Sequence, residues 1–137
     1  TMLRYLRGAQ AALKDDGVLF KDLFGGPETF DVTKEKTKHK GFTYIWEQAE
    51  FHPVTNHMKC HIHFKFPDGS KLNKAFSYEW RLYTAPEMRD LLMEAGFRKV
   101  TVYWEGEDDE GEGNGIFSPD AEGTADLAWI AYIVAEK

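Results

Sequence analysis

The stretch Leu3–Gly26, "LRYLRGAQAALKDDGVLFKDLFGG", constrains the fold more than any other part of the sequence. Apolar side chains recur at helical spacing up to Leu13, and the acidic turn that follows ends the helix at Gly17. The next residues, Val18–Phe24, are mostly apolar, which is typical of a strand covered on both faces. A helix followed by such a strand normally belongs to a parallel sheet with earlier strands, yet only Thr1 and Met2 precede this unit. The sequence therefore predicts an α/β fold of which the first strands lie outside these 137 residues.

Three segments with strand character follow, Gly41–His52, His57–Phe66 and Lys71–Tyr83. The turns between them carry Pro together with Asn, Asp or Gly, as hairpin turns do. The middle segment alternates apolar residues with lysines and histidines, which predicts an antiparallel meander with one buried and one solvated face. The stretch before the meander, Gly25–Gly41, has no periodicity and predicts an exposed, mobile loop.

The segment Thr84–Phe97, "TAPEMRDLLMEAGF", is the clearest helix in the chain, because it opens with a capping box and carries an apolar stripe. A short strand, Lys99–Trp104, comes next, and the acidic, glycine-rich residues Glu105–Gly123 predict a mobile loop. The closing run Leu127–Glu136 is apolar enough to be a central strand buried on both faces. We therefore expect it to pair antiparallel with Val18–Phe24 on one side and to pair with Lys99–Trp104 on the other.

Composition argues against several classes of protein. The formal net charge is −6, with most of the acidic excess in the run Glu105–Gly113, so a broad basic face for nucleic acid is not expected. The spacing of the carboxylates in that run does not match a calcium-binding loop. The single cysteine, Cys60, cannot form an internal disulfide. No apolar run is long enough to span a membrane, and the first residues do not have the layout of a signal peptide. These features predict a cytoplasmic protein with no nucleic-acid or membrane partner.

Three histidines share one face of the middle strand, and a His-x-His pair is able to ligate a metal. They are His57, His61 and His63, and a cupin-like metal site is the corresponding hypothesis. Lys59 and Lys65 lie on the same face, where their charges would repel a cation. A solvated face of alternating lysines and histidines is therefore favoured, and no bound metal is expected.

Aromatic residues number 20 (Phe 10, Tyr 6, Trp 4), so a packed core or a lined pocket is expected. Tyr44 and Trp46 share one face of their strand, and Tyr78 and Trp80 share one face of theirs. Neighbouring strands would join them into one wall, which is either sheet core or a ligand-facing surface. The paired glycines Gly25–Gly26 do not belong to a G-x-G-x-x-G pattern, so no nucleotide-binding loop is identified.

The order of these elements resembles the second half of a class I S-adenosylmethionine-dependent methyltransferase, over nearly all of the chain. Leu13, Asp16 and Gly17 match the turn that leads into the family's fifth strand, with Asp16 in place of the usual first glycine. The stretch Tyr83–Phe97 matches the family's penultimate helix, and "LLMEAGF" is its most specific part. The resemblance implies an α/β fold made of the C-terminal half of a Rossmann-like methyltransferase sheet, with its last strand antiparallel, plus an antiparallel β-meander lid.

On this resemblance, residues 1–24 and 81–137 belong to the methyltransferase core, and residues 41–80 form the lid insertion. S-adenosylmethionine would be bound mainly by the missing N-terminal half, so the fragment would contain no cofactor-binding residues and would be inactive alone. The substrate would be a small molecule, and a homodimer would form through the lid or through the exposed sheet edge. No general base is identified. The residues implied to line the substrate side are Phe24, Trp46, Trp80, Arg81 and Tyr83.

Arg81 is a candidate partner for a substrate carboxylate, with a structural ion pair to Glu79 or Glu87 as the alternative. A different function also stays open, that of a stand-alone α+β binding module for an apolar ligand. It requires a closed antiparallel sheet around a cavity lined by Met58, Ile62 and Phe64. Strand order separates the two functions, because the methyltransferase sheet places the last strand antiparallel between the two strands before it.

Overall fold

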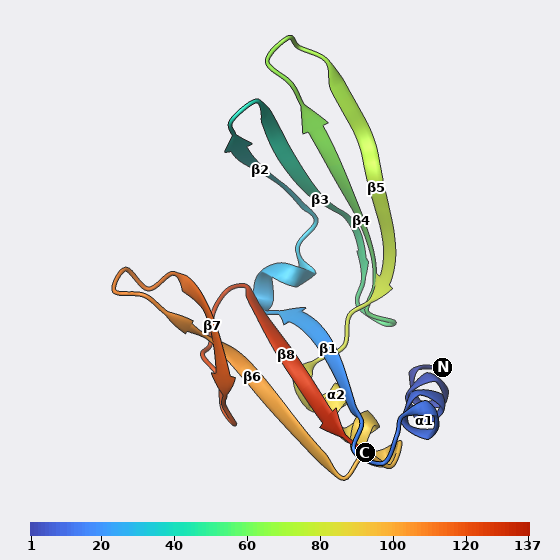
Figure 1. Cartoon of the computed structure of the whole chain (residues 1–137). Coiled ribbons are helices and arrows are strands. Elements are labelled where there is room, and N and C mark those ends of the chain that lie inside the picture. The colour runs from blue at the N-terminus through green and yellow to red at the C-terminus, as the bar shows by residue number, and fades with distance from the viewer. The chain divides into compact units, whose positions relative to one another are not determined.

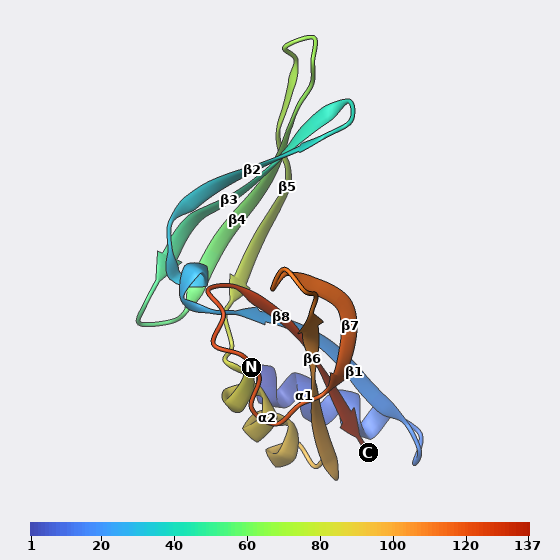
Figure 2. The ribbon, with the colours of Figure 1, turned by 90° about the vertical axis from the view of Figure 1, so that its left-hand side faces the viewer.

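The computed structural model describes all residues, Thr1–Lys137, and divides into two compact units (Figures 1 and 2). Unit 1 comprises Thr1–Gly26 and Tyr83–Lys137, and unit 2 comprises Pro27–Leu82. Unit 2 is thus inserted between the first strand and the second helix of unit 1. The assignment of the two units to a methyltransferase core and a lid stays a prediction.

Unit 1 is a four-stranded antiparallel sheet with two helices on one face. Its strand order is β1-β8-β6-β7, so the C-terminal strand lies between the first strand and the strand after the second helix. Both pairings predicted for the C-terminal strand are confirmed, since β8 is antiparallel to β1 and to β6. The elements are α1 (Met2–Ala12), β1 (Val18–Gly25), α2 (Ala85–Glu94), β6 (Lys99–Glu107), β7 (Gly113–Pro119) and β8 (Trp129–Glu136).

Both helices begin at a threonine cap, of which the one at Thr84 was predicted from the sequence. The Thr1 side chain accepts a hydrogen bond from the backbone N–H of Arg4, and the Thr84 side chain accepts one from Glu87. The apolar stripes of the two helices meet the sheet in one core cluster. Its buried members are Leu6, Met88, Leu92, Ala95, Phe97, Ile133 and Ala135. Neither helix, of 11 and 10 residues, has the length and apolarity required to cross a membrane.

The prediction that the apolar strands are covered on both faces is wrong. Burial alternates along β8, with Ala131, Ile133 and Ala135 fully buried and Ile130 51% exposed. On β1, Phe20 is 60% exposed. The reason is that both helices pack on the same face of the sheet, so the opposite face of unit 1 is apolar and open.

The predicted loop at Glu105–Gly123 is a β-hairpin instead, formed by the end of β6 and by β7. Its turn is closed by Asp108, whose carboxylate accepts hydrogen bonds from the backbone N–H groups of Glu110 and Glu112. Gly111 takes the positive φ of +79° that the turn requires. Sequence periodicity could not reveal β7, because the strand is mostly exposed and a single side chain, Phe117, packs on the sheet, with 4.4 Å between its ring and that of Tyr132.

Unit 2 is a second antiparallel sheet, in the order β2-β3-β4-β5. The predicted meander is confirmed, but the segment before it is ordered as well and supplies a short 3-10 helix and the edge strand β2. The elements are η1 (Pro27–Phe30), β2 (Thr33–His39), β3 (Phe42–His52), β4 (His57–Lys65) and β5 (Lys71–Arg81). The sheet is open, with β2 and β5 at its edges, so it does not form the closed sheet that the alternative binding-module prediction requires.

Candidate functional site

One face of unit 2 carries a continuous set of aromatic side chains, here called the aromatic face. The strand register places Tyr44 opposite Phe64, and Trp46 opposite Ile62. The ring of Trp80 lies 6.2 Å from that of Trp46 and 4.6 Å from that of Tyr78, measured between centroids. The aromatic face consists of Tyr44, Trp46, Phe64, Phe76, Tyr78 and Trp80. Its outer rings are accessible, since Trp80 is 37% exposed and Phe76 54% exposed.

A buried glutamine anchors this face to the chain that precedes the sheet. The Gln48 amide nitrogen donates to the backbone carbonyls of Glu28, at 3.0 Å, and Asp31, at 2.7 Å. Its amide oxygen accepts from the Trp46 indole N–H at 3.4 Å, which fixes the orientation of the indole. The Phe30 ring adds an edge-on contact to Phe51, with 5.2 Å between centroids. In the sequence, this contact is indicated only by one amide residue, Gln48, at a position of β3 that shares its face with Trp46.

The opposite face of unit 2 holds a cluster of hydrogen-bonded charged and polar groups. The Glu47 carboxylate contacts the Lys34 ammonium at 2.9 Å and His63 Nε2 at 2.7 Å. His63 Nδ1 accepts the backbone N–H of Lys74 at 3.0 Å, so its proton lies on Nε2 and is donated to Glu47. The hydrogen bond from Lys34 is the main cause that lowers the pKa of Glu47.

Next to this cluster, His61 Nδ1 is hydrogen-bonded to the Ser77 hydroxyl at 2.7 Å. His61 and His63 are only 5% and 8% exposed, so the prediction of a fully solvated histidine face is wrong at these two positions. The reason is that β4 is a central strand, whose side chains are flanked on both sides. Burial lowers the pKa of His61, which is therefore held in its neutral form. No group of His, Cys, Asp and Glu side chains is arranged to hold a metal ion.

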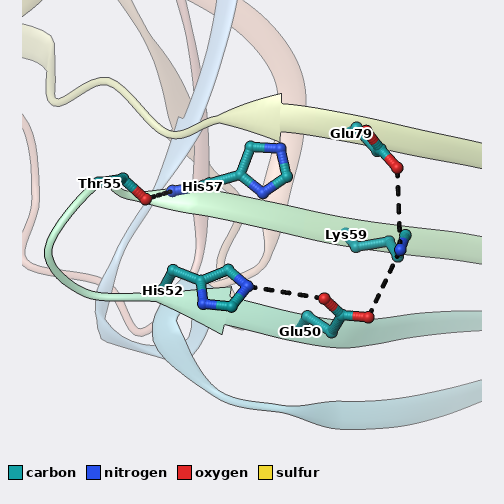
Figure 3. A network of polar contacts seen from close by, with 6 residues as sticks. All are labelled: Glu50, His52, Thr55, His57, Lys59 and Glu79. Atoms are coloured by element: carbon teal, nitrogen blue, oxygen red, sulfur yellow. Dashed lines mark hydrogen bonds and ion pairs between the residues drawn. The ribbon is translucent and has the colours of Figure 1, made fainter.

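At the end of the sheet where β3 turns into β4, a chain of ion pairs crosses three strands (Figure 3). Lys59 lies between Glu50, at 3.5 Å, and Glu79, at 3.8 Å. His52 contacts the other oxygen of Glu50 at 3.6 Å, and the backbone N–H of His57 donates a hydrogen bond to the Thr55 hydroxyl oxygen at 3.3 Å. One ammonium group is therefore shared by two carboxylates here, and the ring nitrogens of His52 and His57 do not converge on a common point (Figure 3).

Of the five residues predicted for the substrate side, three lie in unit 2 and two lie in unit 1. Trp46 and Trp80 are brought together on the aromatic face. Arg81 follows Trp80 directly and is paired with His57 in the register, so alternation places it on the opposite face. Phe24 and Tyr83 belong to unit 1, where Phe24 is paired with Ile130 and Tyr83 packs against the helix–sheet core.

The paired glycines after β1 have a packing role. A Cβ on Gly25 would lie 2.6 Å from Cη2 of Trp129, and one on Gly26 would lie 2.9 Å from the Cα of Ala128. Gly26 also has a φ of +100°. These glycines are required by close packing against Trp129 and Ala128, so they do not form an open cradle for a ligand.

Comparison with known proteins gives a result for structure only. No family model matches the sequence, and no curated protein matches it. The fold is similar to a crystal structure of an S-adenosylmethionine-dependent methyltransferase from Clostridium acetobutylicum ATCC 824, with a TM-score of 0.61 and 12% sequence identity. It is also similar to the CcbJ methyltransferase from Streptomyces caelestis, with a TM-score of 0.59 and 13% identity.

These matches cover 98% and 96% of this chain but only 50% and 48% of the two solved chains. The chain thus spans about half the length of the structures that it resembles. At 12–13% sequence identity, these matches show similarity of fold and not of activity or substrate. The chain has a methyltransferase-like, sheet-dominated α/β fold with two antiparallel sheets.

Proposed function

We propose that this chain is the C-terminal part of an S-adenosylmethionine-dependent methyltransferase that acts on a small molecule. The observation that carries the proposal is the fold match over nearly the whole chain to two methyltransferases of about twice its length. In the proposal, unit 1 is the C-terminal half of a Rossmann-like sheet, and unit 2 is the lid over the substrate. S-adenosylmethionine is then held mainly by residues outside this chain.

The strand order of unit 1 supports this reading. Because β1 and β6 are both antiparallel to β8, they run parallel to each other, and α2 lies between them in the sequence. A parallel strand pair joined through a helix is the building unit of α/β sheets, and β8 is inserted within it. At the other edge of β1, further parallel strands would continue the sheet, which is where the remaining half of the protein belongs in this proposal.

The aromatic face of unit 2 supports a role in substrate binding. Flat, amphipathic rings such as Trp46 and Trp80 exclude water while keeping polar edges for orientation. Methyl transfer depends on aligning the nucleophile with the methyl donor in a dry site, and a lid of this composition serves that requirement. Phe24 and Tyr83 complete the substrate side in the proposal, whereas Arg81 is not part of the aromatic wall.

The test is methyl transfer by the complete polypeptide that the gene encodes, measured with radiolabelled S-adenosylmethionine against a panel of small acceptors. Trp46→Ala and Trp80→Ala should each lower kcat/KM by about tenfold, the effect of losing one aromatic contact of 1–1.5 kcal/mol. The matched control is Tyr5→Ala, which removes an aromatic side chain that is 56% exposed on α1. Equal activity of all three variants, or no transfer to any acceptor, contradicts the proposal.

A further inference from the structure

The two faces of the unit 2 sheet differ in charge. The strand register places six lysines on the face opposite the aromatic face, here called the polar face. They are Lys34, Lys36, Lys38, Lys59, Lys65 and Lys71. Lys40 lies in the turn between β2 and β3. Burial lowers the pKa of His61, and the charge of Lys74 lowers it further, so Lys74 also lies near the polar face. The register therefore places no lysine or arginine of unit 2 on the aromatic face.

One carboxylate, that of Glu35, does lie on the aromatic face. The register places Glu35 directly opposite Trp46, and such partners share a face with about 4.5–5.5 Å between their Cβ atoms. The other glutamates of these strands, Glu47, Glu50 and Glu79, are each paired with a lysine of the polar face. Glu35 lies on the exposed edge strand β2 and forms no ion pair, because its neighbours in the sequence point to the polar face. It is therefore an unpaired negative charge beside an indole ring.

The aromatic rings of β3 and β5 converge over the central strand β4. The Trp80 ring is 6.2 Å from Trp46 and 4.6 Å from Tyr78, measured between centroids. The register pairs Tyr78 with Cys60 of β4, and Cys60 is fully buried. Burial raises the pKa of Tyr44, and the neighbouring Tyr78 raises it further, so these two phenol groups also lie close together. The face thus gathers electron-rich rings, whose flat sides attract positive charge.

We propose that the aromatic face binds a small molecule that carries a protonated amine, with the ammonium group over the Trp46 ring and beside the Glu35 carboxylate. An indole is the strongest of the aromatic side chains in attracting a cation, and an ionised carboxylate accepts the N–H groups of an ammonium. The two groups therefore favour the same ligand charge. An anionic ligand would be repelled by Glu35 and would find no lysine or arginine of unit 2 on this face.

The identification of this amine as the methyl acceptor rests on the proposed function, whereas the binding itself does not. The binding is tested by NMR titration of the 137-residue chain at pH 7 and low salt, following the indole N–H signal of Trp46, which a Trp46→Phe spectrum identifies. The probes are phenethylamine, 2-phenylethanol and phenylacetate, which share an aromatic ring and differ in charge. We expect the amine to bind at least fivefold more tightly than the alcohol and phenylacetate to bind most weakly, with raised salt reducing the differences.

Two variants and a matched control assign the effect to these residues. Glu35→Gln should weaken phenethylamine binding about fivefold and leave 2-phenylethanol unchanged, because only the charge is removed. Trp46→Leu should weaken phenethylamine about tenfold, followed through the chemical shifts of the neighbouring residues. The control is Glu79→Gln, which changes the net charge equally but lies on the polar face beside Lys59, so it should leave the binding of all three probes unchanged (Figure 3).

Several results would overturn the proposal. Equal affinity for the amine and the alcohol would show that the face does not select for charge, and tighter binding of phenylacetate would show the opposite selection. If Glu79→Gln weakens amine binding as much as Glu35→Gln does, the effect comes from net charge alone. Failure of all three probes to shift the Trp46 signal would exclude a ligand role for this face.

These outcomes are distinct from those of the proposed function. Methyl transfer by the complete polypeptide to neutral acceptors, without amine binding, would overturn the amine proposal and leave the proposed function standing. Amine binding that depends on Glu35, without methyl transfer to any acceptor, would support the amine site and contradict the proposed function.

Discussion

The packing of Gly25 against Trp129 gives a quantitative prediction about unit 1. The two residues are paired in the register of β1 and β8, and Gly25 is buried. An added Cβ would lie 2.6 Å from Cη2 and 2.7 Å from Cε2 of the Trp129 ring, well inside van der Waals contact. The ring has little freedom to move, because it packs on Trp104 with 4.8 Å between centroids. Gly25→Ala should therefore lower the free energy of unfolding by about 1–3 kcal/mol, the usual cost of overpacking.

Two further variants show whether the cost comes from this contact. In a Trp129→Leu background the clashing ring is absent, so Gly25→Ala should cost nearly nothing there, a coupling of about 1–3 kcal/mol. Gly8→Ala is the matched control, since nothing lies within 4 Å of a Cβ at that position of α1. That substitution should stabilise the helix by about 0.5–1 kcal/mol.

The measurement is urea unfolding of the four variants followed by far-UV circular dichroism. The reasoning is refuted if Gly25→Ala costs the same in both backgrounds, or if it is neutral in the wild-type chain. A neutral result would also reopen the possibility that Gly25 and Gly26 serve a ligand and not the packing of the sheet end.

Three more predictions concern unit 2. Burial raises the pKa of the Cys60 thiol to about 11, so a thiol reagent at pH 8 should react about 100-fold more slowly with the folded chain than with the urea-unfolded chain. Gln48→Ala leaves the backbone carbonyls of Glu28 and Asp31 without their donor. It should lower the free energy of unfolding in urea by about 1–3 kcal/mol and speed proteolysis of the segment before β2. An unchanged unfolding midpoint would contradict this. Burial lowers the pKa of His61 in the folded state, so the unfolded chain binds more protons as the pH falls. The free energy of unfolding should therefore decrease below about pH 6.5. His61→Gln should make this dependence of the free energy of unfolding on pH less steep.

The elements that were predicted from the sequence are those with an apolar face or a cap. The pairing of Leu127–Glu136 with both of its neighbours followed from its long apolar run, and α2 followed from its cap and stripe. The strands β2 and β7 were missed, because β2 is polar and almost wholly exposed and β7 has only Phe117 partly buried, so neither shows an alternating apolar face; they pair with β3 and β6. Hydrogen-bonded pairing of this kind has no signature in hydrophobic periodicity.

The candidate site was predicted only in part, for a related reason. Trp46 and Trp80 were expected to lie together on neighbouring strands; their rings are 6.2 Å apart, although β4 lies between the two strands that carry them. The contact of His63 with Glu47 depends on which residues of two strands face each other, and register cannot be obtained from composition or alternation alone. Gln48 was overlooked because a buried amide becomes meaningful only when its carbonyl partners are known.

The most direct test of the central proposal is calorimetric titration of S-adenosylmethionine into two proteins. One is the 137-residue chain, and the other is the complete polypeptide that the gene encodes. The proposal that this chain supplies the substrate side, with the cofactor held by the other half, predicts binding to the complete polypeptide and none to the chain alone. Tight binding by the 137 residues themselves, or no binding by the complete polypeptide, would contradict it.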